Sequence, residues 1–149
     1  MTSKKYLTQL MKLDEQIKQK QSQTEELKAI RGNIGSFDYS EERVQTSNNT
    51  SSQVEKEAVK LVLLENEVKE DIIRYAFLKD KIIKEIHQLP NPNHITLLYK
   101  KYVEFKRLEV IAVEMGYAYS HVRKMHGCAL QSFSKLIQND TLECDKMVM

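Results

Sequence analysis

The chain has few of the residues that mark sheets, tight turns and disulfide frameworks. Its 149 residues include only two cysteines, two prolines and four glycines and no tryptophan, whereas 30% of the side chains are charged. This balance favours long, solvated helices over sheets joined by tight turns. The length leaves room for one modest domain, or for one small domain and an extended arm. We therefore expect an all-α protein.

Signals for export and for membrane insertion are also missing. Cys128 and Cys144 are too few and too differently placed to suggest a disulfide framework, which fits a reducing cytoplasm. No apolar signal-peptide core follows Met1, and apolar runs such as residues 61–64 are far too short to span a membrane. These observations predict a cytoplasmic protein that does not associate with membranes.

Familiar catalytic and metal-binding motifs are absent from the sequence. It contains no Gly-rich phosphate loop, no Gly-x-Ser-x-Gly elbow, no His-Glu-x-x-His pair and no cluster of carboxylates. His121, His126 and Cys128 are close in sequence, but they lack the spacing of zinc ligands and a second cysteine pair. Packing, capping or phosphate contact is the expected role of these histidines. We expect no enzymatic activity, no cofactor and no metal.

Two heptad patterns occupy residues 1–89, which we interpret as a helical, coiled-coil-like arm. The first pattern runs from Tyr6 to Leu27, and the second continues from Val54 to Leu89 for about five heptads without Gly or Pro. Residues 31–53 between them are polar, and we expect a flexible connector there. The second pattern passes through these residues: Val54, Ala58, Leu61, Glu65, Val68, Ile72, Tyr75, Lys79, Ile82, Ile86 and Leu89.

A second apolar set widens the surface of the long helix beyond a two-stranded seam. It consists of Val59, Val62, Ile73, Phe77 and Ile83. One partner helix cannot cover both sets, and a lone helix would leave a large apolar surface in water. We therefore expect a homodimer or a higher oligomer through the N-terminal helices. Glu65 and Lys79 interrupt the seam, and their long side chains are expected to reach solvent or to set the register.

A domain boundary is expected at Pro90 and Pro92, because each proline removes a backbone donor and disfavours a helical residue before it. Residues 90–138 follow this boundary, and 139–149 form a polar tail. The segment 90–138 carries 7 basic and 3 acidic side chains, while residues 1–89 are balanced at 15 and 15. A local positive excess of this kind favours a polyanionic partner.

Within residues 90–138, the pattern is that of a helix, a tight turn and a second helix. Leu108, Ile111, Ala112 and Met115 have helical spacing, and Gly116 can adopt the left-handed conformation that ends such a helix. Residues 118–136 then form the second helix, with Val122 and other apolar residues on one face. This arrangement is typical of the helix-turn-helix, whose second helix enters the major groove of DNA.

The early turns of that second helix carry the candidate DNA contacts. Exposed polar side chains on this part of a recognition helix can reach base edges and phosphates. The candidates are Tyr119, Ser120, His121, Arg123 and Lys124. His126, one turn after Val122, is expected to point partly into the interior and to serve packing. The sequence therefore predicts a protein that binds double-stranded DNA.

The residues from Leu108 to Leu130 resemble region four of bacterial sigma factors. The resemblance rests on Leu108, Ile111, Ala112, Met115, Gly116, Val122, His126, Ala129 and Leu130 and covers about one sixth of the chain. In that family the second helix reads the upstream promoter element, which implies contacts at the five positions named above. Arg123 matches the family's residue type, whereas the other four depart from primary sigma factors. The same DNA sequence is therefore not implied.

The whole chain resembles small phage and prophage proteins of Gram-positive bacteria related to the RinA and ArpU regulators. The supporting segments are Lys4-Lys5-Tyr6-Leu7, Arg43-Val44-Gln45-Thr46-Ser47 and the stretch from Tyr117 to Leu130. The resemblance implies activation of phage late genes, with host RNA polymerase as a partner. Two alternatives stay open: a coiled-coil adaptor or inhibitor that binds a protein through residues 54–89, and a sigma-like factor that directs polymerase itself.

Overall fold

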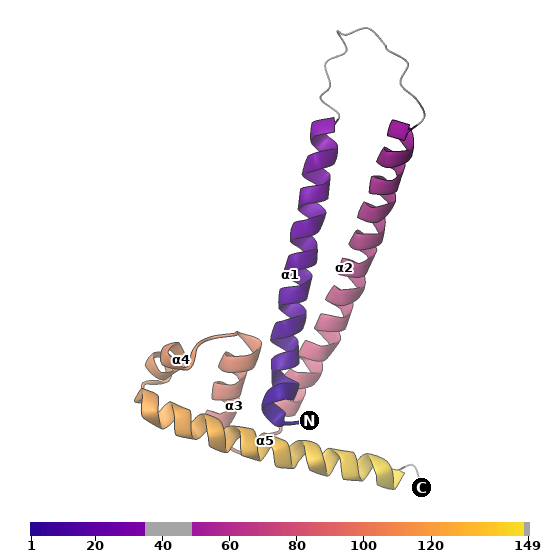
Figure 1. Ribbon diagram of the computed structural model, residues 1–149. Coiled ribbons are helices and arrows are strands. Elements are labelled where there is room, and N and C mark those ends of the chain that lie inside the picture. The colour runs from indigo at the N-terminus through magenta and orange to yellow at the C-terminus, as the bar shows by residue number, and fades with distance from the viewer. Residues whose placement is uncertain (35–48, 148–149) are drawn as a thin grey trace. The chain divides into compact units, whose positions relative to one another are not determined.

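A computed structural model describes residues 1–34 and 49–147 of the chain (Figure 1). Every regular element in these two stretches is helical, which confirms the predicted all-α class. The elements are α1 (Ser3–Ile34), α2 (Asn49–His87), α3 (Pro92–Leu98), the π-helical turn η1 (Tyr99–Val103), α4 (Leu108–Met115) and α5 (Tyr119–Met147). Contacts group the chain into two compact units, 1–13 with 75–149 and 14–74. Both α1 and α2 contribute residues to each unit.

The unit formed by 1–13 and 75–149 has a core built from five elements. The first turns of α1 meet the end of α2, α3, η1 and the middle of α5. Leu7 and Leu10 are fully buried there, and the Tyr6 ring stacks on Phe133 with centroids 6.2 Å apart. The buried residues of this cluster are Leu7, Leu10, Ile82, Ile86, Leu89, Leu98, Tyr102, Val103, Ala129 and Phe133.

A second, smaller core in the same unit holds α4 against the start of α5. Its buried members are Leu97, Ile111, Ala112 and Val122. Gly116 ends α4 with φ +73°, and the Tyr117 backbone N–H donates to the Ala112 carbonyl at 3.0 Å. This is the left-handed turn predicted for Gly116, and the small Ala112 side chain is 4% exposed at the approach between the helices. The predicted helix, turn and helix are thus present.

Before that motif, Pro90 and Pro92 lie where α2 has ended and α3 begins, although residues 75–89 belong to the same compact unit as the residues after them. Asn91 caps α3, because its Oδ1 accepts a hydrogen bond from the Asn93 backbone N–H at 3.0 Å. Pro92 occupies the first turn of α3, where a missing backbone donor costs little. The chain therefore leaves one long helix and starts a short one within a few residues.

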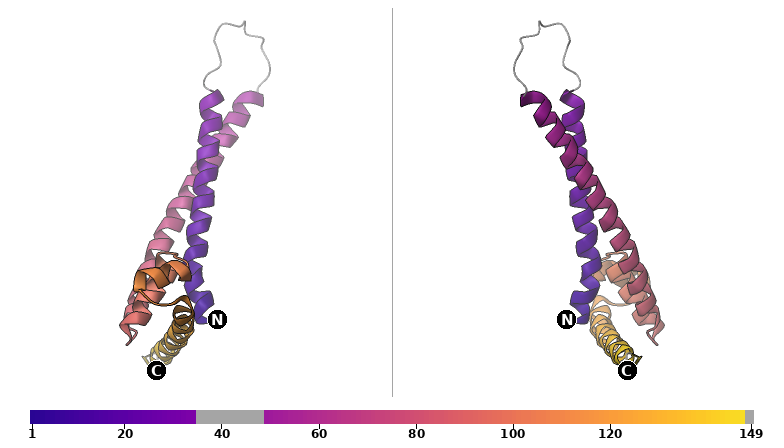
Figure 2. Two further views of the ribbon diagram at one scale, coloured as in Figure 1. Left: turned by 90° about the vertical axis from the view of Figure 1, so that its left-hand side faces the viewer. Right: turned by 90° about the vertical axis from the view of Figure 1, so that its right-hand side faces the viewer.

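In the unit 14–74, α1 and α2 run antiparallel and side by side, as both views of Figure 2 show. Ile17, Leu61 and Val68 are the buried apolar residues of this pair. Ion pairs also join the helices: Lys28 lies 2.9 Å from Glu65, and Lys20 lies 2.5 Å from Asp71. The hydrogen bond from Lys28, and then its positive charge, lower the pKa of Glu65. The charged end of Glu65 is thus paired across the seam rather than simply solvated.

Four details differ from the sequence-based expectations. Residues 31–34 and 49–53 lie in helices, although the connector was expected at 31–53; residues 35–48 lie outside the described part. Residues 139–147 continue α5 instead of forming a tail, since no Gly or Pro interrupts them.

Ile72 and Val54 were expected in the seam but are 44% and 40% exposed. Asp71 takes the buried position beside Ile72, because its charge is paired with Lys20.

Candidate nucleic-acid interface

The first turns of α5 present all five predicted DNA-contact residues to solvent. Tyr119, Ser120, His121, Arg123 and Lys124 are each exposed. The helix is held in place from its other side, because Val122 is fully buried under α4. The structure therefore brings the five side chains together on one short, accessible segment that directly follows the Gly116 turn (Figure 1).

Aromatic rings lie beside the charged and polar groups on this segment. The Arg123 guanidinium is 5.8 Å from the centre of the Tyr119 ring, within the range of a cation–π interaction. The rings of Tyr117 and His121 are 5.1 Å apart. These contacts restrain side chains that would otherwise be free, and a restrained arginine loses less conformational entropy when it binds.

His126 lies one turn further along α5 and is half-buried. Its Nε2 is 2.8 Å from the Tyr102 hydroxyl oxygen, and the two rings stack with centroids 5.8 Å apart. Burial lowers the pKa of His126, and the positive charges of Lys101 and Lys4 lower it further. Burial also raises the pKa of Tyr102 to about 12, so its hydroxyl keeps its proton. The packing role predicted for His126 matches this geometry.

Two lysines near the motif are paired with two carboxylates, Glu114 and Glu104. Glu114 on α4 lies 2.7 Å from Lys100 and 2.9 Å from Lys106. These hydrogen-bonded ammonium groups, first Lys100 and then Lys106, lower the pKa of Glu114. The three residues tie α4 to η1 and to the loop after it. Lys100 and Lys106 already form ion pairs within the protein, so they are not candidate DNA contacts.

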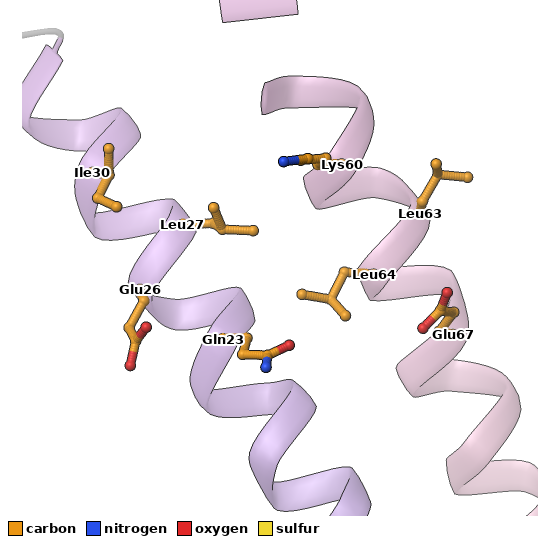
Figure 3. A pocket seen from close by; sticks show the side chains of 8 residues that line it. All are labelled: Gln23, Glu26, Leu27, Ile30, Lys60, Leu63, Leu64 and Glu67. Atoms are coloured by element: carbon orange, nitrogen blue, oxygen red, sulfur yellow. The ribbon is translucent and has the colours of Figure 1, made fainter. Parts of the chain in front are cut away.

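A shallow groove between α1 and α2 is the other feature that could receive a partner (Figure 3). Leu27 and Leu64 point toward one another across it, and both apolar and polar side chains lie around them. The lining residues are Gln23, Glu26, Leu27, Ile30, Lys60, Leu63, Leu64 and Glu67. Apolar contact with another helix suits this lining better than catalysis, for which a paired acid and base within a closed pocket would be needed.

The described residues offer no group of three or more His, Cys, Asp and Glu side chains that could hold a metal ion together. His121 and Cys128, which are close in sequence, are both exposed on α5. In the same described stretches, none of the helices combines the length and the apolar character that a membrane span requires.

The start of α1 packs against α5, a contact that the sequence pattern did not predict. The Ser3 hydroxyl donates to the Leu130 carbonyl at 3.1 Å, and Leu7 is buried with Ala129 and Phe133. The only signal for this contact was the pair of adjacent apolar positions formed by Tyr6 and Leu7.

Comparison with known proteins finds no family model, no curated protein and no solved structure that matches this chain.

Proposed function

We propose that the chain is a DNA-binding regulator of transcription whose helix α5 enters the major groove with its first turns. The observation that carries this proposal is the combination of a left-handed turn at Gly116 with five exposed polar residues at the start of α5. A recognition helix needs both, because the turn sets the crossing of the two helices and the exposed face meets the bases. The positive excess of residues 90–138 supports the same partner.

The biological role within this proposal comes from the resemblance to phage late-gene regulators. On that basis the protein acts in the cytoplasm of a bacterial host as an activator of late genes, with host RNA polymerase as a contact. A sigma-like factor would make transcription from the target promoter independent of the host sigma factor. An activator would leave that requirement in place, so transcription with purified host polymerase, with and without its sigma factor, distinguishes the two roles.

Changing both Arg123 and Lys124 to alanine should weaken binding to DNA by about tenfold to a hundredfold. Each lost phosphate contact should also reduce the slope of log affinity against log salt by about one unit. The full chain first selects preferred duplexes from a randomised pool, and gel shifts at several salt concentrations then compare the variants. The double variant Lys56→Ala, Lys81→Ala removes two exposed charges from α2, outside the groove, and is the control. Unchanged affinity and slope for Arg123→Ala, Lys124→Ala would contradict the assignment.

The N-terminal helices are proposed to join two copies of the chain. Within the unit 14–74, Val59, Val62 and Leu63 of α2 are between 54% and 58% exposed. Together with the groove of Figure 3, they leave an apolar surface that water disfavours. A homodimer would cover this surface and would present two α5 helices to two half-sites on the DNA.

Introducing charge at this surface should separate the copies. We expect Val62→Glu, Leu63→Glu to convert a dimer at micromolar concentration into a monomer, because a buried unpaired carboxylate is costly. Light scattering and sedimentation measure the mass. The control is Gln16→Glu, Gln19→Glu, which adds the same charge at exposed positions of α1. A wild-type protein that is monomeric at these concentrations and still binds DNA fully would overturn the proposed dimer.

The same apolar surface favours a second function, that of an adaptor or inhibitor that binds another protein through residues 54–89. In that case the helix-turn-helix would serve packing alone. A full chain that enriches no duplex from the randomised pool at low salt, yet forms a defined complex with one host protein that Val62→Glu, Leu63→Glu abolishes, would favour the adaptor over the regulator.

A further inference from the structure

One side of α5 connects the candidate recognition turns to two other elements of the same unit. This side is marked by residues spaced alternately four and three apart: Tyr119, Arg123, His126 and Leu130. Such spacing keeps side chains on one face of a helix. The Tyr102 hydroxyl on η1 meets His126 at 2.8 Å, and the Ser3 hydroxyl at the start of α1 donates to the Leu130 carbonyl at 3.1 Å. Hence η1 contacts α5 at His126, and the start of α1 contacts it one turn later, at Leu130.

Each of these two elements carries a lysine next to its contact residue. Lys101 precedes Tyr102, and Lys4 follows Ser3; Lys4 is exposed and Lys101 is half-buried. Among the described residues, no ion pair within 4.0 Å involves either lysine, in contrast to Lys100, which is paired with Glu114. Their charges therefore remain available to a partner.

The two ammonium groups also act on the same part of α5. Both lower the pKa of His126, in addition to the larger effect of its burial. Positive charge thus gathers beside His126 from η1 and from the start of α1, three residues along α5 from the exposed Arg123.

We propose that Lys4 and Lys101 bind the phosphate backbone of the duplex whose major groove receives the first turns of α5. This inference rests on the proposed function and extends the DNA-binding surface to the N-terminal helix. A helix that lies in the groove is flanked by the phosphates of both strands, and basic side chains beside it contact those phosphates. Such contacts add affinity and fix the orientation, but they do not read the bases.

The test compares two double variants that keep a polar, slightly shorter side chain and remove its charge. Lys4→Gln, Lys101→Gln should lower the magnitude of the salt slope by about two and the affinity at about 0.1 M salt by at least about tenfold. The control Lys5→Gln, Lys12→Gln should match the wild type. Both control lysines are exposed and lie on the side of α1 opposite the buried Leu7, because about 3.6 residues complete one turn.

Both variants are titrated with the selected duplex and with a scrambled duplex, after circular dichroism has verified their helix content. Lys4→Gln, Lys101→Gln should weaken both complexes by the same factor, since phosphate contacts are independent of sequence. If the wild type binds the duplex but this variant keeps its slope, or if the control loses as much, the inference is wrong and the proposed function stands. If the wild type binds no duplex, the proposed function fails and the inference fails with it.

Discussion

Replacing Phe133 with alanine should lower the free energy of unfolding by about 3 to 5 kcal/mol. Phe133 is fully buried at the centre of the larger core, where the Tyr6 ring stacks on it. Alanine would leave a cavity between α5 and the first turn of α1, and both would lose apolar contacts. Urea denaturation followed by circular dichroism measures the change.

Two further substitutions make this expectation specific to the cavity. Phe133→Leu keeps part of the volume and should cost clearly less than Phe133→Ala. Gln131→Ala, at an exposed position of the same helix, should change the stability by less than about 0.5 kcal/mol. If Phe133→Ala lowered the free energy of unfolding no more than Gln131→Ala does, Phe133 would not be buried between α1 and α5.

Local pattern was sufficient to predict the helix-turn-helix. Leu108, Ile111, Ala112 and Met115 follow helical spacing, and Gly116 stands where a left-handed residue must end α4. Each of these features depends on residues close in sequence, and local preference and packing agree there. The five candidate contact residues were predicted for the same reason, as the polar positions just after the turn.

The contact between α1 and α5 could not be predicted in the same way. The spacing of Tyr6 and Leu10 identified one stripe on α1, but Leu7 is buried as completely as Leu10. A helix that packs against several neighbours buries a wider face than a two-stranded coiled coil does. Which neighbours those are depends on contacts across more than a hundred residues, such as Ser3 with Leu130. Periodicity within one segment contains no information about them.

The seam between α1 and α2 shows a similar limit. Heptad spacing favoured Ile72 as a seam residue, yet Asp71 is 6% exposed and Ile72 is 44% exposed. An aspartate becomes a seam residue only when the partner helix supplies a cation, and Lys20 does so at this register. The register between two helices is a tertiary property, so a single-helix pattern favours the apolar residue by default.

Replacing Ile111 with alanine should cost about 2 to 5 kcal/mol and should weaken DNA binding as well. Ile111 is fully buried in the small core that joins α4 to the start of α5, together with Leu97, Ala112 and Val122. A core of this size has few other contacts to compensate for a cavity, so the relative position of the two helices should loosen.

The matched control for Ile111→Ala is Val113→Ala on the same helix. Val113 is 82% exposed, so its replacement should alter the stability by less than about 0.5 kcal/mol. Denaturation and gel shifts with the selected duplex are measured on both variants. Because a groove-binding helix needs a fixed presentation, the affinity should fall for Ile111→Ala even at temperatures where the helix content is retained. A folded Ile111→Ala variant with wild-type affinity would mean that α4 does not position α5 for DNA.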